Sequence, residues 1–147
     1  MKRLSLLLIL LIAGCGANQY GDYSYDDFPT ITDWSELETT GTTDSITMVY
    51  YYNRDFFGTD CAGCQIVNTA LFEYGKTNTD DVELILVNER TAMGIRPLSV
   101  NRQPTVFFVQ DGEITYQVFA AQPILEMLEN METGAFDWAL VEGETNE

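Results

Sequence analysis

Short runs of β-branched and aromatic residues mark the strands that this sequence predicts. Residues 46–52 (ITMVYYY), 82–87 (VELILV) and 105–109 (TVFFV) are each predominantly apolar and predict a buried strand. Asp111-Gly112 is a strong hairpin turn, and a returning strand follows over 114–119. The pattern therefore predicts a sheet of about four strands.

Helical periodicity and capping signals lie between these runs. From residue 61 to 76 the apolar residues recur at helical spacing, and residues 123–131 repeat this pattern with a proline in the first turn. Asp33 and Glu36 have capping-box spacing, so we expect a short helix to start there. The order of helix, strand, helix, strand, irregular crossover, strand hairpin and helix predicts an α/β fold in which helices flank the sheet.

The amino-terminal residues have a different pattern. Lys2 and Arg3 precede an apolar run over 4–12, which is too short to span a bilayer and is typical of a signal peptide. Residues 11–15 (LIAGC) resemble the lipobox of bacterial lipoproteins, in which the leader is cut before the cysteine and the cysteine receives a diacylglycerol. The alternative is an ordinary secretory signal in which Cys15 has no such role.

The lipobox resemblance implies a domain organisation and a location. We expect a signal peptide over 1–14, followed by a flexible tether over 15–30, because that segment is rich in Tyr, Asp and Gly and lacks apolar periodicity. The domain then covers 31–141 and an acidic tail covers 142–147. Acyl chains, palmitate among them, on Cys15 would hold the protein in the bacterial cell envelope, on the extracytoplasmic side of a membrane, where disulfides persist.

The charge balance excludes some partners. The chain has 23 acidic and 7 basic residues and no histidine, and loss of Lys2 and Arg3 with the leader would leave a net charge of −18. Such a charge repels nucleic acid phosphates and anionic lipid head groups, so we expect neither as a binding partner, and a monomeric, self-repelling domain. The acidic residues are scattered and form no calcium-binding loop motif.

Cys61 and Cys64 form a C-x-x-C motif at the start of the first long helix. Unpaired backbone N–H groups and the helix dipole stabilise a thiolate at that place, and the thiolate is the nucleophile. Cys64 lies almost one turn further on and can close a disulfide. We therefore expect Cys61 to attack and Cys64 to resolve, without a cofactor. A metal site is an alternative, but two cysteines without histidine make only half of a zinc site.

The strand over 46–52, the helix that starts at Cys61 and the segment 100–105 (VNRQPT) with its following hairpin resemble thioredoxin. In that family a proline before the third strand forms a cis peptide bond beside the active disulfide, and Pro104 has the corresponding position. The resemblance implies a thioredoxin-like fold in which the backbone of Gln103 pairs with an extended client segment. It also implies a thiol–disulfide oxidoreductase whose partners are thiols or disulfides of exported proteins.

Departures from the family leave a second interpretation open. Asp60 replaces the aromatic residue before the first cysteine, and its charge would oppose ionisation of Cys61. The family's buried acid has no clear counterpart: Asp55 has the right spacing, but the long loop over 53–60 would move it out of the core. The alternative is a redox-silent binding or structural module with a fixed Cys61–Cys64 disulfide.

Overall fold

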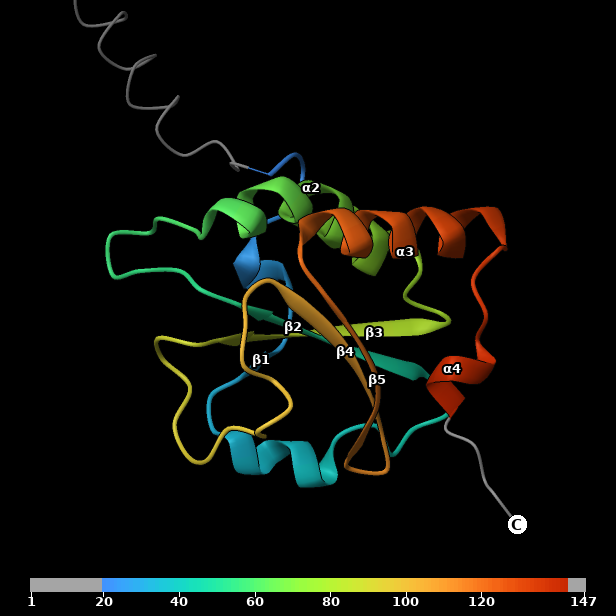
Figure 1. The fold of residues 1–147 in the computed structure, drawn as a ribbon, viewed down its shortest axis with the longest axis horizontal. Coiled ribbons are helices and arrows are strands. Elements are labelled where there is room, and N and C mark those ends of the chain that lie inside the picture. Colours follow the sequence, from blue (N-terminus) through green and yellow to red (C-terminus); the bar gives the residue numbers. More distant parts are fainter. Residues whose placement is uncertain (1–19, 143–147) are drawn as a thin grey trace, which may run out of the picture.

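A mixed five-stranded sheet lies at the centre of the computed structural model, which describes residues 20–142 (Figure 1). The strand order is β1-β3-β2-β4-β5. The strands are β1 (Thr30–Ile31), β2 (Ile46–Tyr52), β3 (Val82–Asn88), β4 (Thr105–Gln110) and β5 (Glu113–Phe119). β1, β3 and β2 are parallel, whereas β4 and β5 run antiparallel to their neighbours. The four predicted strands are confirmed, and the two-residue β1 is one strand more than the sequence predicted.

Helices cover both faces of this sheet. The helical segments are η1 (Tyr25–Asp27), η2 (Trp34–Thr39), α2 (Ala62–Thr77), α3 (Ala121–Thr133) and α4 (Ala139–Glu142). α2 and α3 lie side by side on one face, and η2 lies on the other (Figure 1). The expected short helix is the 3-10 helix η2, and its capping box is present: Asp33 accepts from the Ser35 N–H, and Glu36 accepts from the Asp33 N–H.

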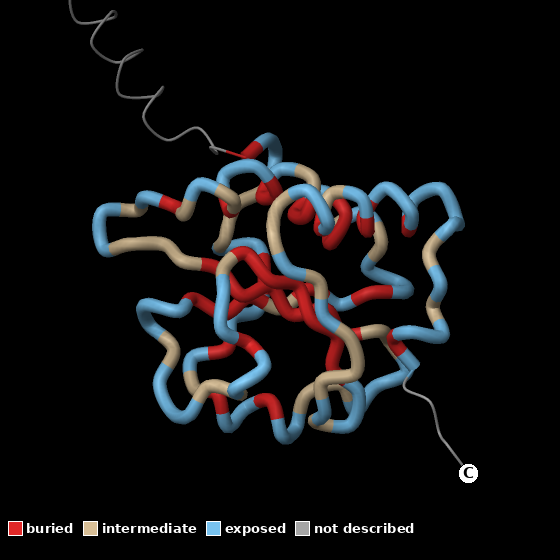
Figure 2. The backbone as a smooth tube through the Cα atoms, in the orientation of Figure 1, coloured by how far each residue is buried: buried red, intermediate tan, exposed pale blue. Residues whose placement is uncertain are grey.

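The sheet is buried on both sides, and Figure 2 shows the buried residues concentrated along its central strands. In β2, Met48, Tyr50 and Tyr52 pack toward α2 and α3, whereas Val49 and Tyr51 pack toward η2. A strand that is covered on both faces has no polar side, which explains the continuous apolar run in the sequence. β2 ends at Tyr52, and the loop over 53–60 leads from it to Cys61.

The segment over 20–30 corrects the expected tether. Tyr20 and Phe28 are buried, and both contact the ring of Phe72 in α2. β1 adds a strand next to β3. These rings have irregular spacing, so the sequence shows no periodicity, although each ring finds a partner in the fold. The folded domain therefore includes residue 20 onward rather than beginning at residue 31.

The remaining amino-terminal predictions fall outside the described part of the chain. The predicted signal peptide (1–14), Cys15 and residues 16–19 belong to that part, as do residues 143–147 of the predicted acidic tail. Between residues 20 and 142, no helix is both long enough and apolar enough to cross a bilayer.

Candidate active site

A disulfide joins Cys61 to Cys64 at the amino-terminal end of α2. Cys61 is the N-cap residue, and its sulfur accepts a hydrogen bond from the Cys64 backbone N–H at 3.1 Å. Cys61 is half-buried, whereas Cys64 is fully buried. The two sulfur-bearing residues therefore differ in access: a partner from solvent reaches Cys61 first, and Cys64 lies behind it.

The cis-proline loop lies against one side of this motif. The Gln103–Pro104 peptide bond is cis, the geometry that the thioredoxin resemblance implied. A Cβ atom added to Gly63 would lie 2.7 Å from Cδ of Pro104, so only glycine permits this contact without a shift. The Pro104 carbonyl accepts a hydrogen bond from the Ala120 N–H at 3.0 Å. Pro104 is thereby fixed beside the disulfide helix, with Gln103 half-buried next to it.

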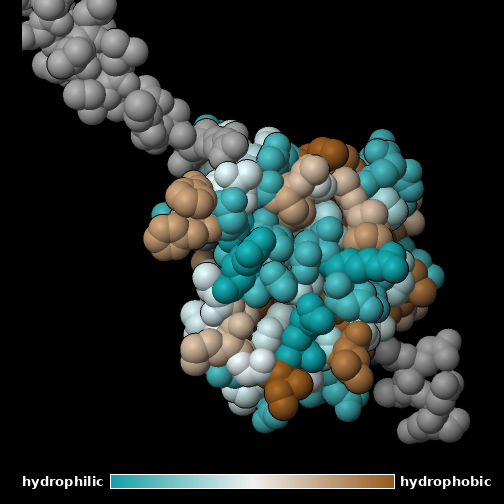
Figure 3. All heavy atoms as spheres, turned by 60° about the vertical axis from the view of Figure 1, so that its left-hand side comes forward, coloured by the Kyte–Doolittle hydropathy of each residue, from teal (hydrophilic) through white to brown (hydrophobic). Residues whose placement is uncertain are grey.

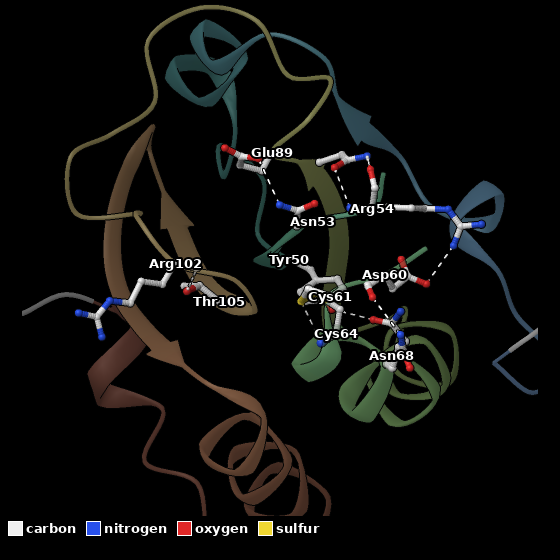
Figure 4. The surroundings of a disulfide bond; sticks show 12 residues. Tyr50, Asn53, Arg54, Asp60, Cys61, Cys64, Asn68, Glu89, Arg102 and Thr105 are labelled. Atoms are coloured by element: carbon white, nitrogen blue, oxygen red, sulfur yellow. Dashed lines mark hydrogen bonds and ion pairs between the residues drawn. A yellow bond between two sulfur atoms is a disulfide. The ribbon is translucent and has the colours of Figure 1, made fainter. Parts of the chain in front are cut away.

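Asp60 lies on the other side and is the buried acid of the site. Figure 4 shows Asp60 and Arg54 on the opposite side of the disulfide from Arg102 and Thr105. The Asp60 side chain is fully buried and accepts hydrogen bonds from the hydroxyls of Tyr20 and Tyr25. The Arg54 guanidinium forms an ion pair with the same carboxylate, with Nη1 and Oδ2 3.0 Å apart.

This arrangement changes the expected effect of Asp60 on Cys61. In the sequence alone, Asp60 is an uncompensated negative charge next to Cys61. In the structure, one cation and two hydroxyl donors reduce the field that the carboxylate exerts at its surroundings. The Asp60 carbonyl also accepts from the side-chain amide of Gln65, which ties this residue to the first turn of α2.

Buried hydrogen bonds extend from Asp60 into the core. The Asn68 side-chain amide donates to the Tyr25 hydroxyl at 2.7 Å, and the Tyr50 hydroxyl donates to the Asn68 carbonyl oxygen at 2.7 Å. The network connects β2, α2 and η1, and Figure 4 shows two of its members, Tyr50 and Asn68, near the disulfide. Since each of these buried polar groups has a partner, the network stabilises one arrangement of the three elements.

The pKa values of the tyrosines reflect this environment. Burial, together with the hydrogen bond to Asp60, raises the pKa of Tyr20 to about 12. The same causes raise the pKa of Tyr25 well above its usual value. Burial alone would lower the pKa of Arg54, but the Asp60 carboxylate raises it above its usual value. Both tyrosines therefore remain neutral donors, and Arg54 remains a cation, at physiological pH.

Asp55, which has the family's spacing before Cys61, is not the buried acid. Its carboxylate accepts from the backbone N–H groups of Phe57 and Thr59, at 2.9 and 2.8 Å, and shapes the loop over 53–60. Asp60 was not predicted from the sequence in this role; the one local signal for it is Arg54, a basic residue six positions earlier in a chain with few basic residues. Among residues 20–142, no three His, Cys, Asp or Glu side chains are grouped as a metal site.

Comparison with solved structures identifies the fold. Thioredoxin of Malassezia sympodialis is 15% identical, with a TM-score of 0.56 over 71% of this chain and 89% of that chain. The chain has a thioredoxin-like fold. Thioredoxin of Trypanosoma brucei brucei is 13% identical with a TM-score of 0.55 and covers 79% of this chain and 97% of its own. Oxidised mitochondrial thioredoxin 3 of Saccharomyces cerevisiae is 17% identical, again with a TM-score of 0.55, and covers 77% and 97%.

These similarities establish the fold and not a closer relationship. No protein-family model matches the sequence, and no curated protein matches it. The thioredoxin-like fold together with the disulfide-bonded Cys61–Cys64 pair suggests thiol–disulfide redox chemistry.

Proposed function

We propose that this protein is a membrane-anchored, extracytoplasmic thiol–disulfide oxidoreductase that uses the Cys61–Cys64 pair. The observation that carries the proposal is the unequal burial of the two cysteines at the start of α2, beside the cis Pro104. A half-buried first cysteine and a fully buried second cysteine fit the roles of attacking and resolving thiol. The clients would be cysteines of exported proteins.

The reaction needs two successive exchanges. In the reduced protein the Cys61 thiolate would attack one sulfur of a client disulfide, forming a mixed disulfide and releasing the other client sulfur as a thiolate. The Cys64 thiolate would then attack the Cys61 sulfur, which releases the second client thiol and forms the Cys61–Cys64 disulfide. Two electrons pass to the client. The same steps in reverse oxidise a client dithiol.

The local groups support the first of these steps. The Cys64 N–H already donates to the Cys61 sulfur, and the dipole of α2 favours negative charge at this end. The Asp60 carboxylate is paired with Arg54 and accepts hydrogen bonds from two tyrosines. These partners reduce the repulsion between its charge and a Cys61 thiolate. The cis-proline loop offers the Gln103 backbone beside the disulfide, where an extended client could pair as a strand.

The membrane part of the proposal rests on the sequence. The positive start, the apolar run over 4–12 and the LIAGC segment agree in position with a lipoprotein leader, and Cys15 would carry the lipid. Mass spectrometry of the protein extracted from a bacterial membrane tests this directly. A diacylglyceryl mass on Cys15, lost in Cys15→Ser, is the expected result, and an unmodified Cys15 would contradict it.

The redox part has its own experiment. We expect the Cys61–Cys64 disulfide to equilibrate with glutathione buffers, and the reduced protein to reduce insulin. Cys64→Ser should accumulate a mixed disulfide with the client, whereas Cys61→Ser should form none. If the disulfide stays oxidised in all of the glutathione buffers and insulin is not reduced, the proposal is wrong. That result would favour the module with a fixed disulfide.

A further inference from the structure

The loop over 53–60, here called the aromatic loop, exposes two phenylalanines a few residues before Cys61. Phe56 is 98% exposed and Phe57 is 90% exposed. Their rings contact each other edge to face, with centroids 5.8 Å apart. Hydrophobic side chains protrude from the hydrophilic surface on this side of the molecule (Figure 3). Adjacent exposed rings of this size indicate a surface that meets an apolar partner.

The fold holds these rings outward. Arg54 and Asp60 pair as an antiparallel bridge at the base of the loop. Above it, the Asp55 N–H donates to the Thr59 carbonyl, and the Gly58 N–H donates to the Asp55 carbonyl. Gly58 has a positive φ of 80°, which glycine adopts without strain. The turn is therefore closed by hydrogen bonds, and the exposure of its two rings is a built feature of the loop.

The same end of the molecule receives the chain that leads to Cys15. Tyr20, the first described residue, donates a hydrogen bond to Asp60 at the base of the aromatic loop. Cys15 precedes Tyr20 by five residues, and even a fully extended segment of that length spans only about 17 Å. A lipid on Cys15 would thus keep Tyr20, and with it the aromatic loop, close to the bilayer surface.

We propose that Phe56 and Phe57 insert into the interfacial layer of the bilayer that holds the lipid on Cys15. This inference rests on the anchor in the proposed function. The charged groups of the loop allow it, because Arg54 is paired with Asp60 and the Asp55 carboxylate accepts two backbone N–H groups. Two contacts, the acyl chains and the two rings, then fix how the domain stands on the membrane.

This orientation narrows the class of client. The aromatic loop runs directly into Cys61, so insertion of its tip brings the disulfide end of the domain near the lipid head groups. Clients would then present their cysteines close to the membrane surface, as membrane-attached proteins do. Freely diffusing proteins would have less access to that end.

Quenching by brominated lipids tests the insertion. The full chain with Phe57→Trp is extracted from host membranes, checked for its lipid by mass spectrometry, and reconstituted in phosphatidylcholine vesicles with and without brominated acyl chains. The matched control is Leu98→Trp, since Leu98 is 94% exposed but lies beside η2 on the other face of the sheet. The unsubstituted chain gives the background of Trp34 and Trp138.

We expect the added signal of Phe57→Trp to fall at least about twofold in brominated vesicles, and that of Leu98→Trp to change little, because quenching requires contact with the acyl region. Equal quenching of the two variants on a chain that carries the lipid would overturn the insertion but not the anchor. An unmodified Cys15 would overturn both. If Phe56→Ser with Phe57→Ser slows insulin reduction without vesicles, the rings contact clients, and the bilayer proposal is wrong.

Discussion

The two sides of the Cys61–Cys64 disulfide are held by different kinds of interaction. On one side, Asp60 collects a guanidinium and two tyrosine hydroxyls in a buried polar network. On the other side, Gly63 contacts the ring of Pro104, and the fit depends on the absence of a side chain. The first side depends on charge and on the segment around residues 20–25, and the second depends on close packing. The two sides should therefore fail under different perturbations.

The largest effect is expected from Asp60→Ala. This substitution leaves Arg54 without its ion pair and two buried tyrosine hydroxyls without their acceptor. Loss of one partner of a buried charged network costs about 3 kcal/mol, so the free energy of unfolding of the oxidised protein in urea should fall by about that amount.

The matched control is Asp80→Ala, which removes a carboxylate from an exposed turn. Its free energy of unfolding should stay within about 0.5 kcal/mol of the original chain. If Asp60→Ala is no less stable than this control, the polar network does not hold that side of the site.

The next effect is a loss of stability at alkaline pH. In the folded chain the pKa of Tyr20 is raised to about 12, and that of Tyr25 is raised still further. An unfolded tyrosine has a pKa near 10. Raised folded pKa values give stability that is complete below pH 10 and is lost as pH rises from 10 through 12.

Urea midpoints of the oxidised protein between pH 9 and pH 12 measure this loss. Tyr20→Phe with Tyr25→Phe should lessen the decline, although Tyr50 and Tyr52, whose pKa values burial also raises, keep part of it. An unchanged decline in the double variant would separate these two hydroxyls from the alkaline response.

The smallest effect is expected from Gly63→Ala. The added methyl group would lie 2.7 Å from Cδ of Pro104 and 3.2 Å from its Cγ, so α2 and the proline loop must move apart. Overpacking of this size costs about 1–2 kcal/mol. Urea unfolding measures the cost, and Ala62→Ser, on an exposed neighbour, should change the midpoint little. Equal urea midpoints for the two variants would show that the proline loop moves away from α2 without a loss of stability.

The sequence predicted the elements whose signals are local. The apolar run over 46–52 coincides with β2 because a strand covered on both faces is predominantly apolar. The helical spacing after Cys61 predicted α2 to within a residue at each end. The C-x-x-C motif and Pro104 came together because the resemblance supplied their relative placement, which neither segment carries alone.

The burial of Asp60 could not be predicted in the same way. Its partners come from three separate places, residues 20, 25 and 54, and only the folded chain brings them together. Tyr20 and Tyr25 stand in a segment with the composition of a linker, and nothing local distinguishes a ring that packs from a ring in solvent. The sequence therefore reveals the charge of Asp60 but not the groups that compensate this charge.

The Tyr20–Asp60 hydrogen bond also has a mechanical consequence. Any tension applied to the chain before residue 20 reaches the described fold at Tyr20, whose hydroxyl is bound to the residue next to Cys61. The load therefore falls first on the tyrosine–carboxylate contact and the aromatic packing against Phe72, before it reaches the sheet. Traction from the amino-terminal side would thus loosen the polar side of the disulfide first and leave the Gly63–Pro104 contact intact.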